Sequence, residues 1–437
     1  MGRNSPVFQG VPSGEESGRI TPHRPTAAGR ESPVKIRSAP PRVLPSGLAA
    51  LLLGALLLSI PGSATAEEDV PAPPASPTPK RVTASTPFRG GVCWVGTADR
   101  TGLQYLADQG VPWLSVTPFA YGHRDAHQPP EGGYRPSRFR GESREGIAEV
   151  IDVAHELELR VLLKPHIWFN RNGQWRGDIS MRSEEDWVKW FAMYREFLDP
   201  FIDLAVEKKV AAFCIGCELA GTVGRTAEWR ALIEHIRGRY SGELTFAANW
   251  HAEYEAIQFW SDLDWIGIQA YFPLTPSKTP TVDDLRQGWL PWKRSLESFA
   301  KKQKKPIVFT EIGYRPEVDN GREPWGWRVT GERDPAAQER AYRALFDTFE
   351  DTPWMEGMHI WKWFAGISPG DAARRRRGHD SFSPQGMPAE ALIFETFRRW
   401  EEARTPKKEA PKKKPPQEGT PKPAPPPSGG KDLRVRD

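Results

Sequence analysis

The 437-residue chain contains only three cysteines, Cys93, Cys214 and Cys217, which are too few for a network of disulfide bonds. The fold must therefore depend on a hydrophobic core, and the chain is long enough to form a large one. Cys214 and Cys217 form a C-x-x-C pair, but on an extended strand this spacing predicts side chains on opposite faces. We therefore expect buried thiols rather than a redox or zinc site.

Other signals of ligand chemistry are also missing. The first predicted strand is not followed by the glycine-rich turn that binds dinucleotides, and no calcium-binding loop is present. The formal net charge is only +4, and the basic excess lies in the two ends, so the middle of the chain is slightly acidic. An acidic body argues against nucleic-acid binding, which needs a basic face. The sequence predicts an activity that uses no cofactor and no metal.

The first 66 residues differ in composition from the middle of the chain. Residues 1–46 are rich in Pro, Gly, Ser and Arg and are predicted to be disordered. The apolar segment 47–60 is followed by Ala64-Thr65-Ala66, and together they have the length and the small-residue cleavage site of a signal peptide. We interpret residues 1–66 as a leader that directs export to the periplasm, the cell envelope or the medium. Retention as a membrane anchor is the alternative.

Proline-rich segments flank the remaining domain. Residues 67–86 are predicted to be an extended linker, and residues 404–437, with nine prolines and ten basic side chains, a disordered Lys/Pro-rich tail. The tail could contact an anionic cell wall or membrane weakly, although a solubilising role is the simpler interpretation. All 18 tryptophans lie between Trp94 and Trp400. We therefore assign the folded domain to residues 87–403 and expect it to be a monomer.

Eight short apolar runs alternate with amphipathic stretches in this domain. The alternation predicts parallel strands that are covered by helices on both sides. Eight such units fit an α/β fold of the (β/α)8 TIM-barrel type, and an open doubly wound sheet is the alternative. The predicted strands are 88–95, 112–120, 159–169, 210–219, 244–250, 264–272, 306–314 and 355–364, and the helices between them include 143–158, 184–208, 226–239, 282–303 and 334–350.

Two glutamates stand at predicted strand ends, where the active sites of this fold lie. Glu218 ends the fourth strand and Glu311 the seventh, and charge there is costly unless it is solvated, paired or functional. Either glutamate alone could form an ion pair at the barrel rim. Two carboxyl groups across a barrel mouth suit glycoside hydrolysis, in which one protonates the leaving oxygen and the other attacks the anomeric carbon or activates water.

Aromatic, amide and basic side chains occupy the other predicted strand ends. Aromatic faces stack on sugar rings, and amides and hydroxyls form hydrogen bonds with sugar hydroxyls, so these residues predict a carbohydrate site. Trp361 and Trp363 have the same parity on the eighth strand, and both are predicted to face inward, with Trp363 nearer the mouth. The candidate substrate-binding residues are Trp94, Lys164, His166, Trp168, Asn249, Gln269, Tyr271, Trp361 and Trp363.

Five motifs spread over residues 88–400 carry a family resemblance. They are LLKPHIW (162–168), IGCELAGT (215–222), DWIGIQAYFPL (264–274), FTEIGYR (309–315) and HDSFSPQGMPAEALI (379–393). In this order they resemble clan A of the glycoside hydrolases and, more narrowly, glycoside hydrolase family 113, a β-mannanase family. The resemblance implies a retaining hydrolase of β-1,4-linked mannan or a related hemicellulose. It also implies that Glu218 is the general acid/base, Glu311 the nucleophile and Tyr271 its orienting partner, with a strand-eight tryptophan as the floor of the sugar subsite.

Two residues depart from the clan pattern. Cys217 precedes the acid/base where much of the clan has Asn, which removes a donor to the sugar 2-hydroxyl. Asn249 and His166 are candidates to replace it. Gln269 stands where some clan members have His. Two alternatives therefore stay open: a glycosidase for a different β-glycan, and a non-catalytic barrel that binds polysaccharide or organises the cell envelope.

Overall fold

The computed structural model describes residues 88–169, 174–326, 331–367 and 382–404. The predicted leader (1–66), the linker (67–86) and all but the first residue of the tail (404–437) lie outside these ranges. Among the described residues, no helix is both long enough and apolar enough to cross a membrane.

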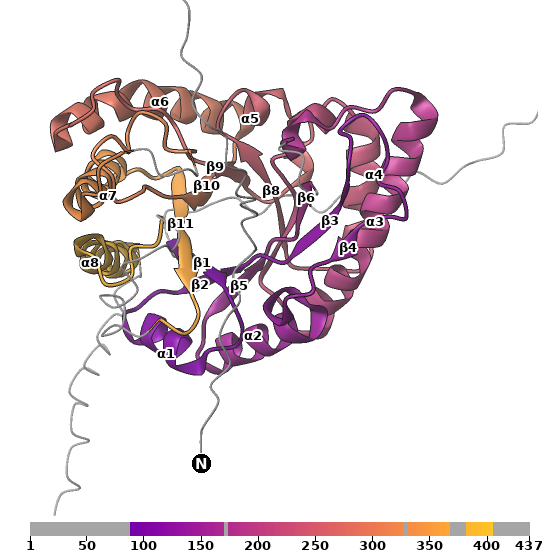
Figure 1. The fold of residues 1–437 in the computed structure, drawn as a ribbon, viewed down its shortest axis with the longest axis horizontal. Coiled ribbons are helices and arrows are strands. Elements are labelled where there is room, and N and C mark those ends of the chain that lie inside the picture. The colour runs from indigo at the N-terminus through magenta and orange to yellow at the C-terminus, as the bar shows by residue number, and fades with distance from the viewer. Residues whose placement is uncertain (1–87, 170–173, 327–330, 368–381, 405–437) are drawn as a thin grey trace, which may run out of the picture. The chain divides into compact units, whose positions relative to one another are not determined.

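Eight parallel strands form a closed barrel, which confirms the (β/α)8 prediction and excludes an open sheet (Figure 1). Around the barrel the strands follow the order β1-β11-β10-β9-β8-β7-β5-β2, and the last of these pairs with β1. Every predicted apolar run contributes one barrel strand. The barrel strands are β1 (Arg89–Val95), β2 (Trp113–Val116), β5 (Arg160–Leu163), β7 (Ala212–Cys217), β8 (Glu243–Asn249), β9 (Ile266–Gln269), β10 (Ile307–Ile312) and β11 (Met355–Phe364).

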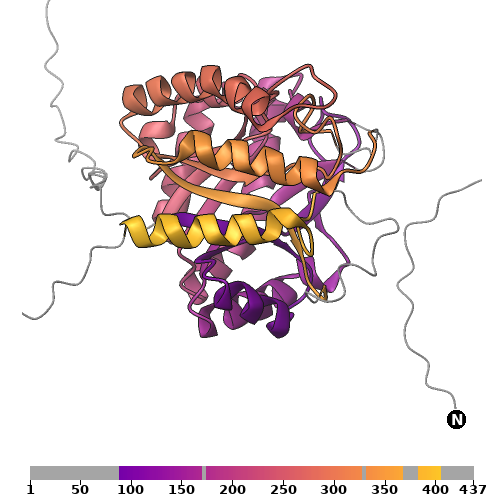
Figure 2. The same ribbon diagram turned by 90° about the vertical axis from the view of Figure 1, so that its left-hand side faces the viewer.

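Helices surround the barrel, and α6, α7 and α8 lie side by side along its outer face (Figure 2). Helix α7 begins as predicted, because the Asp334 side chain accepts a hydrogen bond from the Ala336 amide and Pro335 occupies the first helical position. The helices are α1 (Arg100–Asp108), α2 (Arg144–Glu156), α3 (Glu184–Glu207), α4 (Thr226–Arg237), α5 (Glu253–Ala256), α6 (Val282–Gln303), α7 (Pro335–Phe349) and α8 (Pro388–Arg404), with 3-10 turns at Arg140–Glu142, Arg176–Asp178, Ala220–Thr222 and Trp260–Asp262.

The second and third predicted strands are each divided in two by a proline. Pro118 and Pro165 lack the N–H that the barrel ladder needs, so the chain leaves the barrel at these positions. It then forms a small three-stranded sheet of β3 (Phe119–His123), β4 (Arg135–Pro136) and β6 (His166–Phe169). This sheet carries two of the predicted site residues.

At the amino ends of its strands the barrel holds a buried arginine with two carboxylate partners. Arg89 pairs with Glu356 and, at 2.9 Å, with Glu243. Its guanidinium lies 6.0 Å from the ring centroids of both Trp113 and Trp265. A buried charge is stable only when it is paired, and here Glu243 of β8 and Glu356 of β11 are the partners of Arg89.

Cys214 and Cys217 do not point to opposite faces, contrary to the sequence prediction. Both are buried free thiols and belong to the same cluster of side chains, together with Ala212 and Ala247. The pairing of β7 with β8 contains one extra residue between the two cysteines. An extra residue reverses the alternation, which places both thiols on one side.

Trp363 is also on the wrong face for a substrate-binding residue. It is 1% exposed and packs against Phe394 of α8, with the ring centroids 5.4 Å apart. The register between β1 and β11 slips by one residue between Ile360 and Trp363, so the parity that it shares with Trp361 no longer predicts a common face. Trp363 belongs to the core between barrel and helix.

Trp94 is a second core residue that was predicted to bind substrate. It is 2% exposed, and its indole packs against α1, where a Cβ on Gly102 would come within 2.9 Å of the ring. Its Nε1 donates to the Thr97 carbonyl at 3.1 Å. Position 94 shares the outward face of Val92, so the strand end alone was a poor guide to the direction of the side chain.

The two strand-eight tryptophans should therefore respond differently to truncation. We expect Trp363→Ala to lower the free energy of unfolding by about 3–5 kcal/mol, because it leaves a cavity under α8. We expect Trp361→Ala, whose ring is partly exposed, to keep the thermal transition and to lose activity instead. Measuring thermal unfolding and hydrolysis for both variants tests this prediction. Equal destabilisation of the two would show that Trp361 is also a core residue.

Candidate active site

Glu311 lies within β10, and both of its carboxylate oxygens are held by donors that follow the ends of β5 and β9. Oε1 accepts a hydrogen bond from Lys164 Nζ at 2.5 Å, and Oε2 accepts one from the Tyr271 hydroxyl at 3.1 Å. The side chain is only 6% exposed. Glu311 is therefore fixed in one orientation before any substrate binds.

Lys164 is a fully buried ammonium that stays charged because of Glu311. Burial alone would lower the pKa of Lys164, but the neighbouring Glu311 carboxylate outweighs this effect and the pKa is raised. Nζ also donates to the Thr310 carbonyl at 3.2 Å and lies 5.8 Å from the centroid of the Trp361 ring. Burial, followed by the charge of Glu311, raises the pKa of Tyr271 well above its ordinary value, so the phenol keeps its proton. Both donors to Glu311 thus retain their hydrogens.

Glu218 follows β7 directly and lies at the mouth of the barrel. Its backbone is left-handed, with φ of 51°, a conformation that is uncommon for residues other than glycine and that occurs often at functional sites. Oε2 accepts from Arg176 Nη2 at 2.5 Å, and Oε1 accepts from Asn249 Nδ2 at 3.0 Å. The side chain is 13% exposed, more than that of Glu311.

Arg176 binds Glu218 although no pattern in the sequence predicts it as a site residue. It begins the short 3-10 turn Arg176–Asp178 in the loop after β6, and its side chain is 4% exposed. Burial lowers the pKa of Arg176, but Cys217 and Glu218 raise it more, so the guanidinium remains charged. No strand-end position marks this residue, since it lies in a connecting loop.

Arg176, Cys217 and Gln269 connect the surroundings of the two glutamates. Arg176 Nη2, which binds Glu218, is also 3.6 Å from Cys217 Sγ. Gln269 Nε2 donates to the same sulfur at 3.2 Å, and its Oε1 accepts from Thr310 Oγ1 at 3.1 Å. Gln269 is fully buried, and both its amide nitrogen and its amide oxygen form hydrogen bonds within the protein. It therefore supports the site residues and does not face the substrate.

His166 presents two unpartnered ring nitrogens in the same place. It is 1% exposed, its Nε2 lies 3.8 Å from Glu311 Oε1, and within the described ranges neither nitrogen has a hydrogen-bond partner. Burial, and then the charges of Arg176 and Lys164, lower the pKa of His166 well below its ordinary value. A neutral imidazole offers one donor and one acceptor to a hydroxyl group.

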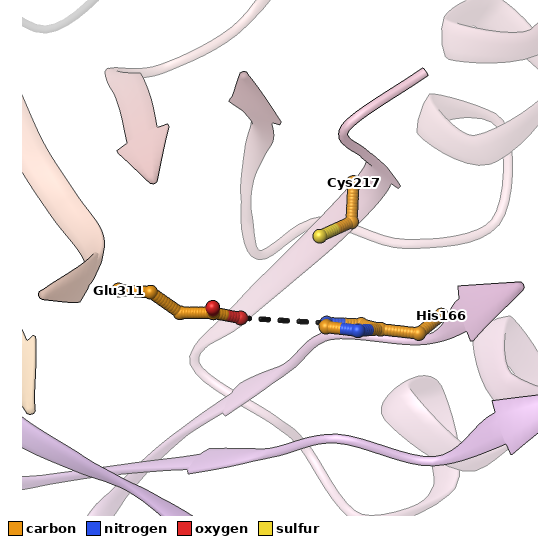
Figure 3. A group of neighbouring side chains, drawn as sticks. All are labelled: His166, Cys217 and Glu311. Carbon is orange, nitrogen blue, oxygen red and sulfur yellow. Dashed lines mark ion pairs between the residues drawn. The ribbon is translucent and has the colours of Figure 1, made fainter. Parts of the chain in front are cut away.

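His166, Cys217 and Glu311 have the composition of a metal site (Figure 3). One possible ligand atom from each lies within 4.8 Å of the others. However, Lys164 already binds Glu311, and Arg176 lies beside Cys217. Burial raises the pKa of the Cys217 thiol well above its ordinary value, whereas a metal needs the thiolate. With two fixed cations next to these atoms, the arrangement fits a neutral polar ligand better than a metal ion.

Two exposed tryptophan rings lie on the described surface, and one of them contacts the arginine that binds Glu218. Trp168 on β6 is 43% exposed, and its ring is covered on one side by Arg176 at 4.8 Å. Trp325, which was not predicted, is also 43% exposed and stacks on Trp250 with centroids 5.2 Å apart. Trp250 directly follows Asn249 in the chain and also packs against Phe272 and Trp292. These rings have open faces of the kind that pack against sugars.

The structure thus brings together most of the predicted residues. Trp94 and Trp363 belong to the core, and Gln269 lies beneath the site. The residues at or beside the two glutamates are Lys164, His166, Trp168, Asn249, Tyr271 and Trp361, and the structure adds Arg176 to them.

Comparison with known proteins agrees with this geometry. The sequence profile of Glycoside Hydrolase Family 113 matches residues 89–383. The solved structure of AaManA, a GH113 β-mannanase from Alicyclobacillus acidocaldarius in complex with ManMIm, is 27% identical, has a TM-score of 0.62, and is matched over 72% of this chain and 99% of that one. Two structures of GH113 β-1,4-mannanase are 23% identical, with TM-scores of 0.61 and 0.62 over the same shares, and support the fold. No curated protein sequence matches the chain significantly.

A parallel (β/α)8 barrel with polar and aromatic groups around two glutamates at the carboxyl ends of its strands is typical of glycoside hydrolases, the class of enzyme that the matched profile identifies. The matched profile extends over more than half of the sequence. The chain belongs to glycoside hydrolase family 113.

Proposed function

We propose that this enzyme cleaves β-1,4-linked mannan or a related hemicellulose by a double displacement that retains the anomeric configuration. The observation that carries the proposal is the pair of glutamates at the barrel mouth, each of which accepts hydrogen bonds from one charged and one neutral side chain. Glu311 is the deeper of the two and acts as the nucleophile. Glu218 is nearer to solvent and acts first as general acid and then as general base.

The contacts of Glu311 suit attack on an anomeric carbon. Lys164 and Tyr271 orient the carboxylate so that one oxygen can approach the sugar along a fixed direction. When the glycosyl-enzyme forms, the carboxylate charge disappears, and the two donors remain to stabilise the ester oxygens and later the departing carboxylate. Trp361, over which Lys164 lies, is placed to form the floor of the reacting subsite.

The contacts of Glu218 suit proton transfer to and from the glycosidic oxygen. Its greater exposure gives water access for the second step, in which Glu218 takes a proton from the attacking water. Asn249 is occupied by Glu218 through Nδ2 and by the His251 amide through Oδ1. Of the two candidates for contact with the sugar 2-hydroxyl, we favour His166, because neither of its ring nitrogens has a hydrogen-bond partner among the described residues.

A panel of purified β-mannan, glucomannan, xylan and β-glucan tests the proposed substrate. We expect new reducing ends from mannan and glucomannan, and far fewer from xylan and β-glucan. The AaManA complex supports this order, since that homologue is described as a β-mannanase. Reducing ends from β-glucan or xylan alone would assign a different β-glycan.

The same panel addresses the non-catalytic alternative. If a folded preparation binds mannan but releases no reducing ends over long incubation, the barrel is a polysaccharide-binding protein. The double variant Glu218→Ala/Glu311→Ala is the matched control, because any release that persists in it comes from a contaminant.

A further inference from the structure

Glu253 is a buried carboxyl group that the proposed reaction does not use. It begins the short helix α5, directly after the loop that follows β8, and is 2% exposed. A carboxyl group is seldom buried this completely unless other polar groups hold it. The hydrogen-bond partners of Glu253 therefore indicate what the side chain does.

Both partners of Glu253 belong to backbone next to Glu218. Oε2 accepts a hydrogen bond from the Asn249 amide at 2.6 Å, and the Leu219 amide also interacts with the carboxyl group. Asn249 is the residue whose side chain donates to Glu218, and Leu219 is the residue that follows Glu218. Glu253 thus ties the end of β8 to the segment after β7.

We propose that Glu253 is a positioning residue, which acts on the reaction by holding Asn249 and the Glu218–Leu219 backbone in place. The left-handed backbone at Glu218 needs support from its surroundings. The Glu218 amide donates to the Ala247 carbonyl of β8 at 2.9 Å, and Glu253 interacts with the amide of the next residue, Leu219. The inference rests on the proposed acid/base role of Glu218.

The charges around Glu253 indicate which form of the side chain does this. Burial raises the pKa of Glu253 to about 8; the Glu218 charge acts in the same direction, while the Asn249 and Leu219 amides and Arg176 oppose it. At neutral pH the group is therefore largely uncharged. It holds the backbone as a hydrogen-bond acceptor and needs no negative charge for this.

If Glu253 acts as an uncharged hydrogen-bond acceptor, substitution by Gln and by Leu, which are similar in size, should have different effects. Gln resembles the uncharged acid and keeps a carbonyl acceptor, whereas Leu has no acceptor. We expect Glu253→Gln to retain nearly full activity and Glu253→Leu to lose about 100-fold in kcat/KM on mannan, the effect of a displacement of about 1 Å at a catalytic group. Glu255→Leu is the matched control, since Glu255 lies on the same helix with an exposed side chain.

The substrate dependence distinguishes positioning from a general loss of structure. A glycoside with a dinitrophenyl leaving group needs no proton from Glu218, so its kcat/KM should change little in Glu253→Leu. In addition, the effects of Glu253→Leu and Asn249→Ala on mannan should not add, because both act through the same contact. Thermal unfolding establishes that the variants are folded at the assay temperature.

Three results would overturn the inference: equal loss on both substrates, full activity of Glu253→Leu, or a Gln variant as impaired as the Leu variant. The results also distinguish a failure of the Glu253 proposal from a failure of the proposed role of Glu218. If Glu218 is not the acid, then Glu218→Ala itself will not discriminate between the two leaving groups. If Glu218→Ala discriminates and Glu253→Leu does not, only the positioning role is wrong.

Discussion

Glu311→Ala is expected to reduce hydrolysis of every substrate on the order of 10⁶-fold, because removal of a nucleophile removes the covalent route altogether. Activated aryl glycosides should be affected as strongly as mannan, since a good leaving group does not replace the attacking carboxylate. The shortened side chain also leaves space beside Lys164, whose ammonium then lacks its anionic partner. Added azide should occupy that space and attack the anomeric carbon directly.

The configuration of the azide product makes this prediction specific. A single displacement by azide from the side of Glu311 gives a glycosyl azide of inverted configuration, which proton NMR identifies. Glu234→Ala is the control, because Glu234 is an exposed carboxylate on the outer helix α4. A product of retained configuration, or wild-type rates without azide, would contradict the assignment of Glu311 as nucleophile.

Glu218→Ala should show the second-largest effect and a different dependence on the leaving group. We expect a loss of about 10²–10⁴-fold in kcat/KM on mannan, the usual contribution of a general acid. Dinitrophenyl glycosides should keep most of their kcat/KM, because their leaving groups depart unprotonated. Their kcat should nevertheless fall, since no base then activates water and the glycosyl-enzyme accumulates.

Azide should rescue Glu218→Ala by the opposite stereochemical route. The substitution leaves Arg176 without its 2.5 Å carboxylate partner, and the freed guanidinium supplies a binding site for the anion. Azide would then attack the glycosyl-enzyme from the side of residue 218 and give a product of retained configuration. An inverted product, or an equal loss on mannan and on the dinitrophenyl glycoside, would show that Glu218 is not the acid/base.

The same contacts show why the site is divided between a rigid and a more accessible carboxyl group. Glu311 receives its donors from Lys164, which directly follows β5, and from Tyr271, which follows β9, and its side chain is only 6% exposed. Glu218 receives Arg176 and Asn249 from the rim. A nucleophile benefits from fixed geometry, and an acid/base needs a path for the second substrate, water.

Local patterns in the sequence were sufficient to predict the barrel and the strand ends that carry the site. Apolar runs of strand length alternating with amphipathic stretches specify parallel strands covered by helices, and the barrel closes because eight such units are present. Glu218, Asn249, Tyr271 and Glu311 could be placed because each interrupts an apolar run at its carboxyl end. The resemblance to family 113, which the matched profile confirms, rested on the same segments.

Only the tertiary structure decided which side chains face the site and which distant residues complete it. Extra residues in the pairing of β7 with β8 and of β11 with β1 reverse the alternation, so Cys214 and Cys217 share a face and Trp363 turns into the core. Such register changes arise from contacts between strands and leave no periodic signal in either strand alone. Arg176 comes from a loop and Glu253 from a single helical turn. Arg176 binds Glu218, and Glu253 binds the Asn249 amide next to it, only because the closed barrel brings the ends of β5, β7 and β8 to one rim.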